Sequence, residues 1–135
     1  MLPLTRQSAA ETQLAAAVLN DVDVLIVDDT GVVRETLQEG LTAHGMHVTV
    51  AANGREALGI LRKRAVSSRP LQLMLLDYPL PNDDSTGLTR ILRADPSLHD
   101  IRVILMSHGA VRNEREALAA TGCAALIYKQ IGRAH

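Results

Sequence analysis

The sequence predicts an α/β fold: one doubly wound, five-stranded parallel sheet with helices on both faces. Short apolar runs alternate with helix-like stretches along the chain, an order that is typical of parallel sheets. Residues 24–27 and 73–76 are continuous aliphatic runs, as expected for strands covered on both sides. With 135 residues, the chain has the length of one domain with its own core.

The predicted elements follow one another in regular order. Thr30 can cap the helix after the first strand, and Gly45 marks its end. Asn53 and Gly54 form a turn signal before the next helix. Two prolines and a polar cluster argue against regular structure over residues 78–85. The predicted strands are residues 24–27, 47–51, 71–76, 101–106 and 123–128, and the helices carry apolar stripes at Val33, Leu37 and Leu41, at Ala57, Leu58 and Leu61, and within residues 86–94 and 112–121.

The two ends of the chain depart from a simple strand–helix repeat. Residues 5–20 are rich in alanine and prone to form a helix. After the fifth strand, by contrast, we expect the closing helix to be truncated or missing. We expect residues 1–21 to form an amino-terminal helix or linker, residues 22–131 the folded domain, and residues 132–135 a tail.

The amino-terminal helix has two interpretations. In one hypothesis it packs beside the helix over residues 33–41 through Leu14, Ala17 and Val18, and so fills the position of the missing last helix. In the alternative it is a flexible linker left from a longer protein.

Composition excludes several classes of protein. Hydrophobic residues make up 47% of the chain without any Phe or Trp, which predicts an aliphatic core. The formal net charge of -1 gives neither a basic surface for nucleic acid nor a polybasic membrane patch. The sequence shows neither a membrane-spanning apolar run nor a secretory signal, so we expect a cytoplasmic domain. Cys123 is expected to be buried, and Asp83 and Asp84 to be solvated in a loop.

Charged residues stand at the ends of three predicted strands. Asp28 and Asp29 follow the first strand, Asp77 follows the third, and Lys129 follows the fifth. Because the carboxyl ends of parallel strands lie at one edge of a sheet, these side chains should converge on one crevice. Three carboxylates repel one another there unless a cation joins them. Mg2+ prefers such hard oxygen ligands and often adds phosphate oxygens, so the pattern indicates phosphoryl chemistry.

Five segments carry a resemblance to a known family. They are VLIVDD (24–29), ANGREAL (52–58), LLDYPLP (75–81), VILMS (103–107) and ALIYK (125–129). In order and spacing they resemble the receiver domain of two-component signalling proteins, over residues 22–131. The resemblance implies a flavodoxin-like strand order, 2-1-3-4-5.

The resemblance also implies a function for the acidic cluster. Asp77 would take a phosphoryl group from a histidine kinase or a histidine phosphotransfer protein, with Mg2+ required. Asp29, Asp77 and the backbone carbonyl of Pro79 would ligate the metal, and Asp28 would act mainly through water. A carboxylate is a nucleophile that can form a covalent aspartyl phosphate.

Two further residues would act on the phosphoryl group by the same resemblance. Lys129 would pair with one phosphoryl oxygen. The Ser107 hydroxyl would bond another once Asp77 is modified, and would draw the following loop inward as a signal. The domain would then be mainly a signalling module that catalyses its own phosphorylation, with a second copy of the chain as a further candidate partner.

The chain departs from the family pattern at the far end of the site. Gln130 follows Lys129 where the family usually has a proline, often after a cis bond, and a cis bond before a non-proline residue costs about 2.5 to 4 kcal/mol. Leu126 stands where an aromatic switch residue is common. His108 replaces a small residue, which predicts slow loss of phosphate from Asp77.

These departures leave alternative readings. Similar departures occur in receivers of hybrid histidine kinases, and residues 128–135 are similar to the carboxyl-terminal segment of those receivers. A degenerate pseudo-receiver, acting as a phosphorylation-independent protein-interaction module, is favoured by Gln130, Leu126 and His108. A flavodoxin-like cofactor binder is disfavoured, because the chain has no glycine-rich phosphate loop and few aromatic residues.

Overall fold

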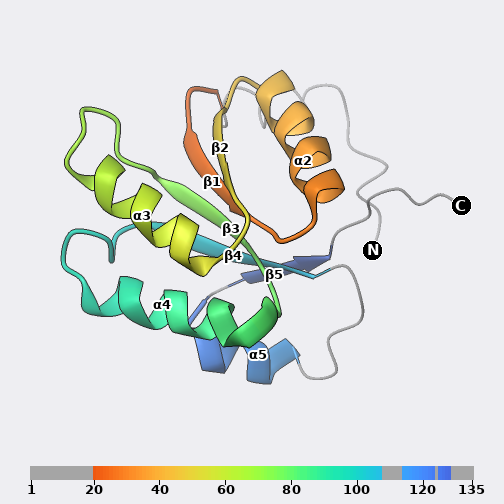
Figure 1. Ribbon diagram of the computed structural model, residues 1–135, viewed down its shortest axis with the longest axis vertical. Helices are drawn as coiled ribbons and strands as arrows, with labels where there is room; N and C mark the ends of the chain where they lie inside the picture. The colour runs from red at the N-terminus through yellow and green to blue at the C-terminus, as the bar shows by residue number, and fades with distance from the viewer. Residues whose placement is uncertain (1–19, 108–113, 124, 129–135) are drawn as a thin grey trace, which may run out of the picture.

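The computed structural model describes residues 20–107, 114–123 and 125–128. Strands and helices alternate through these residues, and every strand pairing is parallel (Figure 1). In chain order the elements are β1 (Asp23–Val27), α2 (Gly31–Ala43), β2 (His47–Ala51), α3 (Gly54–Ala65), β3 (Leu73–Asp77), the 3-10 turn η2 (Pro81–Asp83), α4 (Asp84–Ala94), β4 (Arg102–Ser107), α5 (Glu114–Thr121) and β5 (Ala125–Tyr128).

The five strands lie in the order β2-β1-β3-β4-β5. This order confirms the predicted doubly wound parallel sheet. The register aligns the carboxyl ends of neighbouring strands, since Val27 at the end of β1 lies beside Leu76 on β3. Asp77, the next residue of β3, lies beside Met106 on β4. One edge of the sheet therefore collects the residues that end β1, β3, β4 and β5.

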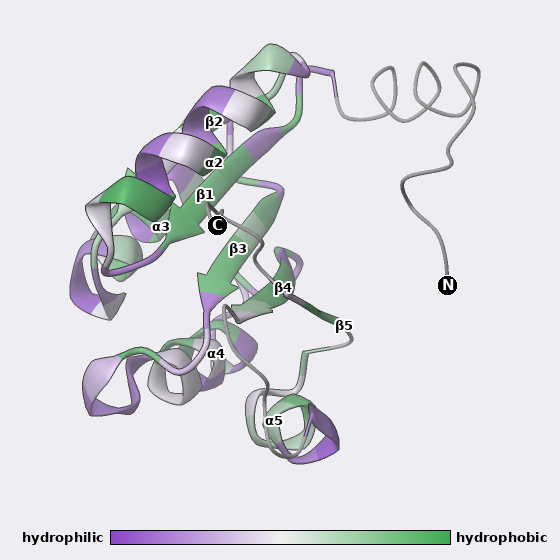
Figure 2. Ribbon diagram, turned by 90° about the vertical axis from the view of Figure 1, so that its right-hand side faces the viewer, coloured by the Kyte–Doolittle hydropathy of each residue, from purple (hydrophilic) through white to green (hydrophobic). Residues whose placement is uncertain are grey.

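The sheet separates two apolar layers. On one face, α3, α4 and α5 pack over the larger cluster, which includes Leu25, Leu61 and Leu92. On the other face, α2 packs through Leu37 and Leu41, as their spacing predicts (Figure 1). Figure 2 shows that the central strands β1 and β3 are strongly apolar along most of their length.

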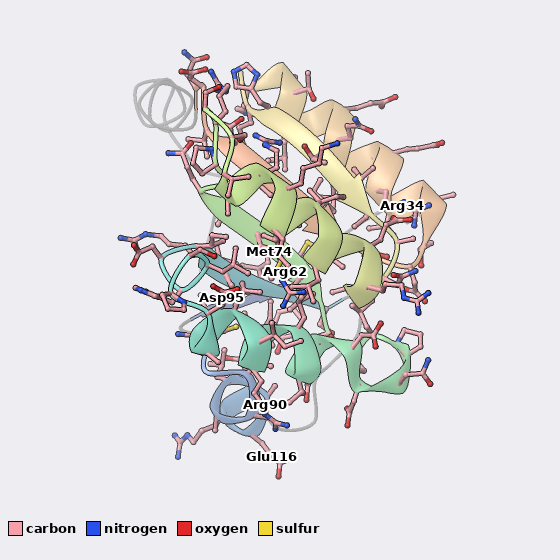
Figure 3. All side chains as sticks on the ribbon, turned by 60° about the vertical axis from the view of Figure 1, so that its left-hand side comes forward. Arg34, Arg62, Met74, Arg90, Asp95 and Glu116 are labelled. Carbon is pink, nitrogen blue, oxygen red and sulfur yellow. The ribbon has the colours of Figure 1, made fainter. Side chains whose placement is uncertain are left out.

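The core is aliphatic, as the composition predicts. Met74 is fully buried in the larger cluster and lies close to α3 (Figure 3). Cys123 belongs to the same cluster and is only 6% exposed, which confirms the expectation that it is buried. Fully buried aliphatic residues typically contribute about 1.5 to 3 kcal/mol each by leaving water.

The strand boundaries differ from the predicted ones by one or two residues. β3 begins two residues late, at Leu73, although the Gln72 amide already donates to the Asp23 carbonyl at 2.9 Å. β5 also begins two residues late, since the Cys123 amide donates to the Thr121 hydroxyl at 3.3 Å. β4 starts after Ile101, whose amide closes a turn.

The expectation of irregular structure over residues 78–85 is wrong in its second half. Pro81–Asp83 forms a 3-10 turn, and α4 begins at Asp84 rather than at residue 86. Proline suits the first turn of a helix, where its missing amide hydrogen is not needed. Asn82 and Asp83 take left-handed φ angles of 62° and 59°, which these two residue types tolerate best after glycine.

Some predicted segments fall outside the described residues. They are residues 5–19 with the proposed contacts of Leu14, Ala17 and Val18, and the tail over residues 132–135. The amino-terminal helix and its docking beside α2 therefore stay a proposal. Across the described part of the chain, none of the helices has the length and apolar character that a membrane crossing requires.

An ion-pair network joins the amino ends of the strands, opposite the edge that collects the acids. The Asp23 side chain is 8% exposed and lies 3.1 Å from Arg64 and 2.9 Å from Arg69. Arg69 also contacts Asp21 at 3.1 Å. Hydrogen bonds from His47 and Arg69 hold the pKa of Asp21 below its usual value. The network ties the start of β1 to the last turn of α3 and to the loop before β3.

Asp23→Asn should lower the free energy of unfolding by about 1 to 3 kcal/mol, because a buried acceptor loses its charge-assisted hydrogen bonds. Urea unfolding measures the change. The matched control is Asp100→Asn, whose side chain is 94% exposed and which should stay within about 0.5 kcal/mol of the parent. Equal effects of the two substitutions would mean that the network adds no stability.

Candidate functional site

Three carboxylates converge at the carboxyl edge of the sheet. Asp28 and Asp29 follow β1, and Asp77 ends β3, the strand beside it. One carboxylate oxygen from each lies within 4.8 Å of the other two. Asp28 is fully buried and Asp77 is 2% exposed, whereas Asp29 is exposed. The structure therefore brings together the three acids that the sequence singles out.

The chain around Asp28 is fixed by neighbours on both sides. Its amide donates to the carbonyl of Ala51 on β2 at 3.1 Å. Its carboxylate accepts the Thr30 amide at 2.9 Å, and its carbonyl accepts the Arg34 guanidinium at 2.7 Å. Thr30 is the cap residue of α2, as predicted, but its side chain makes no capping hydrogen bond. Instead, the Asp28 carboxylate accepts the hydrogen bond from the Thr30 amide, immediately before the helix.

Arg34 is a residue that the sequence reasoning missed. It projects from the first turn of α2 (Figure 3) and binds the backbone of Asp28. Its contact joins a side chain to a backbone carbonyl six residues earlier, and such a contact leaves no periodic signal in the sequence. In the structure it fixes the strand-to-helix turn that presents Asp28 and Asp29.

The backbone after Asp77 is fixed by one buried hydroxyl. Ser85, only 1% exposed, donates to the Asp77 carbonyl at 2.6 Å and accepts the Leu80 amide at 3.0 Å. The Tyr78 amide donates to Met106 on β4 at 2.8 Å. Pro79, whose carbonyl is the expected metal ligand, is exposed within this fixed turn. The sequence reasoning missed Ser85, although a serine just inside a helix start is a signal for such a bond.

Asp84 does not behave as the sequence suggests. Its carboxylate accepts the Gly54 amide at 3.1 Å, so it binds the amino end of α3 instead of remaining solvated in a loop. Anionic groups are favoured there because free amides and the helix dipole both attract them. Asp83 is exposed, as expected.

Ser107, a further predicted site residue, lies at the same edge. Ser107 ends β4 one residue beyond the partner of Asp77, and it is 4% exposed. Tyr128 ends β5 in register with Ser107. Lys129 follows immediately, but Lys129, His108 and Gln130 lie outside the described residues. Their positions therefore stay predictions.

The charge of the cluster determines what it can bind. Two carboxylates at such a separation repel by on the order of 3 to 4 kcal/mol at an effective dielectric of about 20. A divalent cation offsets this repulsion. The donor set of carboxylate oxygens fits Mg2+ because this ion prefers hard oxygen ligands and retains waters.

Known proteins place this arrangement in a family. The sequence profile of the response regulator receiver domain matches residues 24–135. The polar-differentiation response regulator DivK of Brucella anthropi is 32% identical over 108 residues, which cover 80% of this chain and 84% of DivK. The transcriptional regulatory protein AruR of Pseudomonas aeruginosa is 44% identical over 70 residues, which cover 52% of this chain and only 29% of AruR.

The solved structures agree with the sequences. The phosphorylated cyanobacterial phytochrome response regulator RcpA has a TM-score of 0.68 and 27% identity, with 83% of each chain covered. The chain therefore belongs to the response regulator receiver domain family of two-component signalling. The resemblance drawn from its five segments is confirmed.

Ser85→Ala should destabilise the domain by about 1 to 3 kcal/mol, because two buried backbone groups lose their partner. Chemical denaturation measures this change, and Ser68→Ala, at an exposed position, serves as the control. If Ser85→Ala unfolds at the same denaturant concentration as the parent, the hydroxyl does not fix the turn after Asp77.

Proposed function

We propose that this receiver domain accepts a phosphoryl group on Asp77 from the phosphohistidine of a histidine kinase or a phosphotransfer protein. The observation that carries the proposal is the convergence of Asp28, Asp29 and Asp77 within 4.8 Å at the carboxyl edge of the sheet. The relative RcpA, whose structure is that of a phosphorylated response regulator, supports it by similarity.

The chemistry is a displacement at phosphorus. A carboxylate oxygen of Asp77 attacks the phosphorus, the nitrogen–phosphorus bond of the donor breaks, and the imidazole leaves with the electron pair. Charge spreads over the three equatorial oxygens, so catalysis consists of positioning and neutralisation. When bound, Mg2+ would supply much of this neutralisation through Asp28, Asp29, Asp77 and the Pro79 carbonyl.

The chain's own residues orient the reacting groups. Ser85 holds the Asp77 backbone, and Arg34 holds that of Asp28, so both carboxylates start from fixed main-chain positions. Lys129 would pair with a phosphoryl oxygen. Ser107 would donate its hydroxyl to another and move toward Asp77.

The wider assignments rest on the same proposal. The domain would signal by a surface change, and it would be the receiver of a hybrid histidine kinase. A homodimer and cytoplasmic location belong to the proposal as well. The pseudo-receiver alternative draws its support from Leu126 and from His108 and Gln130, of which the last two lie outside the described residues, whereas the three acids do converge.

The proposal is tested by thermal unfolding with Mg2+ alone and with Mg2+ plus beryllofluoride, which mimics a phosphoryl group on aspartate. A ligand that binds the folded state raises the midpoint of thermal unfolding. At a ligand concentration 100 times the dissociation constant, the added stability is about 2.7 kcal/mol. We expect a rise in the parent that Asp77→Asn abolishes and the control Asp83→Asn retains. A parent that does not respond would favour the pseudo-receiver.

Metal affinity should distinguish the two acids that follow β1. Asp28→Asn should weaken Mg2+ binding by about tenfold, as for an outer-shell partner, and Asp29→Asn should weaken it more. Calorimetric titration with Mg2+ measures both, with Asp83→Asn as a control that binds like the parent. Stronger loss with Asp28→Asn than with Asp29→Asn would reverse the assignment of the direct ligand.

A further inference from the structure

The last residue of β5 is an aromatic one, Tyr128. Tyr128 lies in register with Ser107, the residue that ends β4. In-register residues of parallel strands point to the same face of the sheet. Ser107 is 4% exposed, whereas Tyr128 is 46% exposed. A surface aromatic side chain thus stands directly beside the buried hydroxyl that the proposed function assigns to the phosphoryl group.

Tyr128 is tied to the neighbouring helix by one hydrogen bond. Its hydroxyl donates to the Glu114 carboxylate at 2.7 Å. This bond raises the pKa of Tyr128, with smaller contributions from burial and from the charge of Glu114. Glu114 is the first residue of α5, which packs against the sheet through Ala117. The bond therefore connects the end of β5 to the start of α5.

Leu126, two residues earlier on β5, lacks a group that could make or break such a hydrogen bond. Leu126 is partly buried against the larger apolar cluster and has no polar group. The whole chain contains two tyrosines and no other aromatic residue apart from histidine. Tyr78 precedes the acceptor turn and packs against the same cluster. Tyr128 is the aromatic residue that reaches both the surface and a polar partner.

We propose that the Tyr128–Glu114 hydrogen bond reports the state of Asp77: it is made in the unmodified domain and broken when Asp77 carries a phosphoryl group. This inference rests on the proposed function, because it requires Ser107 to move toward Asp77. Movement of Ser107 shifts the end of β4 against β5, where Tyr128 is its direct neighbour. A hydrogen bond of 2.7 Å is lost after a displacement of about 1 Å.

The exposed location of the bond makes the change small enough to be reversible. Water replaces Glu114 as the partner of the Tyr128 hydroxyl at once, since both side chains reach solvent. Release frees the tyrosine ring on β5, which is an edge strand of the sheet. The surface that a partner meets at β5 thus differs between the two states.

Tyrosine emission tests the inference at neutral pH. The chain has no tryptophan, so with Tyr78→Phe in every protein compared, all emission comes from Tyr128. A tyrosine hydroxyl bonded to a carboxylate is quenched. We expect Mg2+ plus beryllofluoride to raise the emission, Glu114→Gln to raise it without ligand and to remove most of the further response, and Asp77→Asn to remain unresponsive.

Thermal unfolding of the same proteins separates the two levels of the proposal. A midpoint that rises with beryllofluoride while the emission stays unchanged would overturn the Tyr128 inference and leave the acceptor function standing. If neither the midpoint nor the emission responds, both fail. If the midpoint of Glu114→Gln still rises by the parental amount while its emission is altered, Glu114 acts in the hydrogen bond with Tyr128 and not in the acceptor site.

Discussion

The repulsion among three carboxylates is the constraint on which the rest of this structure depends. Asp28, Asp29 and Asp77 lie within 4.8 Å of one another, and two of them are almost completely buried. Desolvated like charges are costly, so the surrounding fold must hold them in place. The pairing of β1 with β3 does so, together with the bonds from Arg34 and Ser85 to the backbone carbonyls of Asp28 and Asp77. The cluster is thus a product of strand order as much as of residue type.

The fold separates stability from chemistry. Two aliphatic layers and the Asp23 network stabilise the middle and the amino end of the sheet. The carboxyl edge holds the acids, and the side chains of Ser85 and Arg34 fix its turns by binding main-chain carbonyls. A charge change at Asp77 can therefore alter the edge without loosening the core. This separation suits a domain that must switch and remain folded.

Much of the fold could be predicted because it follows from local patterns. The strand over residues 47–51 agrees with β2 at both ends, and the acids at strand ends meet as parallel topology requires. Polar side chains whose partners lie outside their own helix escaped prediction. Asp84 binds the Gly54 amide across 30 positions, and Ser85 bonds backbone groups on the preceding turn. Single polar residues of this kind carry no periodic signal in the sequence.

The errors in strand boundaries have the same origin. β5, for example, begins late because the Thr121 hydroxyl captures the Cys123 amide before the ladder begins. Apolar runs show which residues are buried, and Leu71 and Cys123 are indeed buried although neither belongs to a strand. Burial and strand pairing are separate properties, and sequence pattern reports the first more directly.

The central claim is that Asp77 is a working acceptor, and a direct chemical measurement tests it. The full chain is incubated with Mg2+ and a small acyl phosphate donor, and the modified residue is mapped by mass spectrometry. The account predicts one phosphoryl group on the peptide containing Asp77, dependent on Mg2+ and lost on treatment with alkaline hydroxylamine, as expected for an acyl phosphate. Absence of modification, or modification of another residue with Asp77 intact, would contradict it.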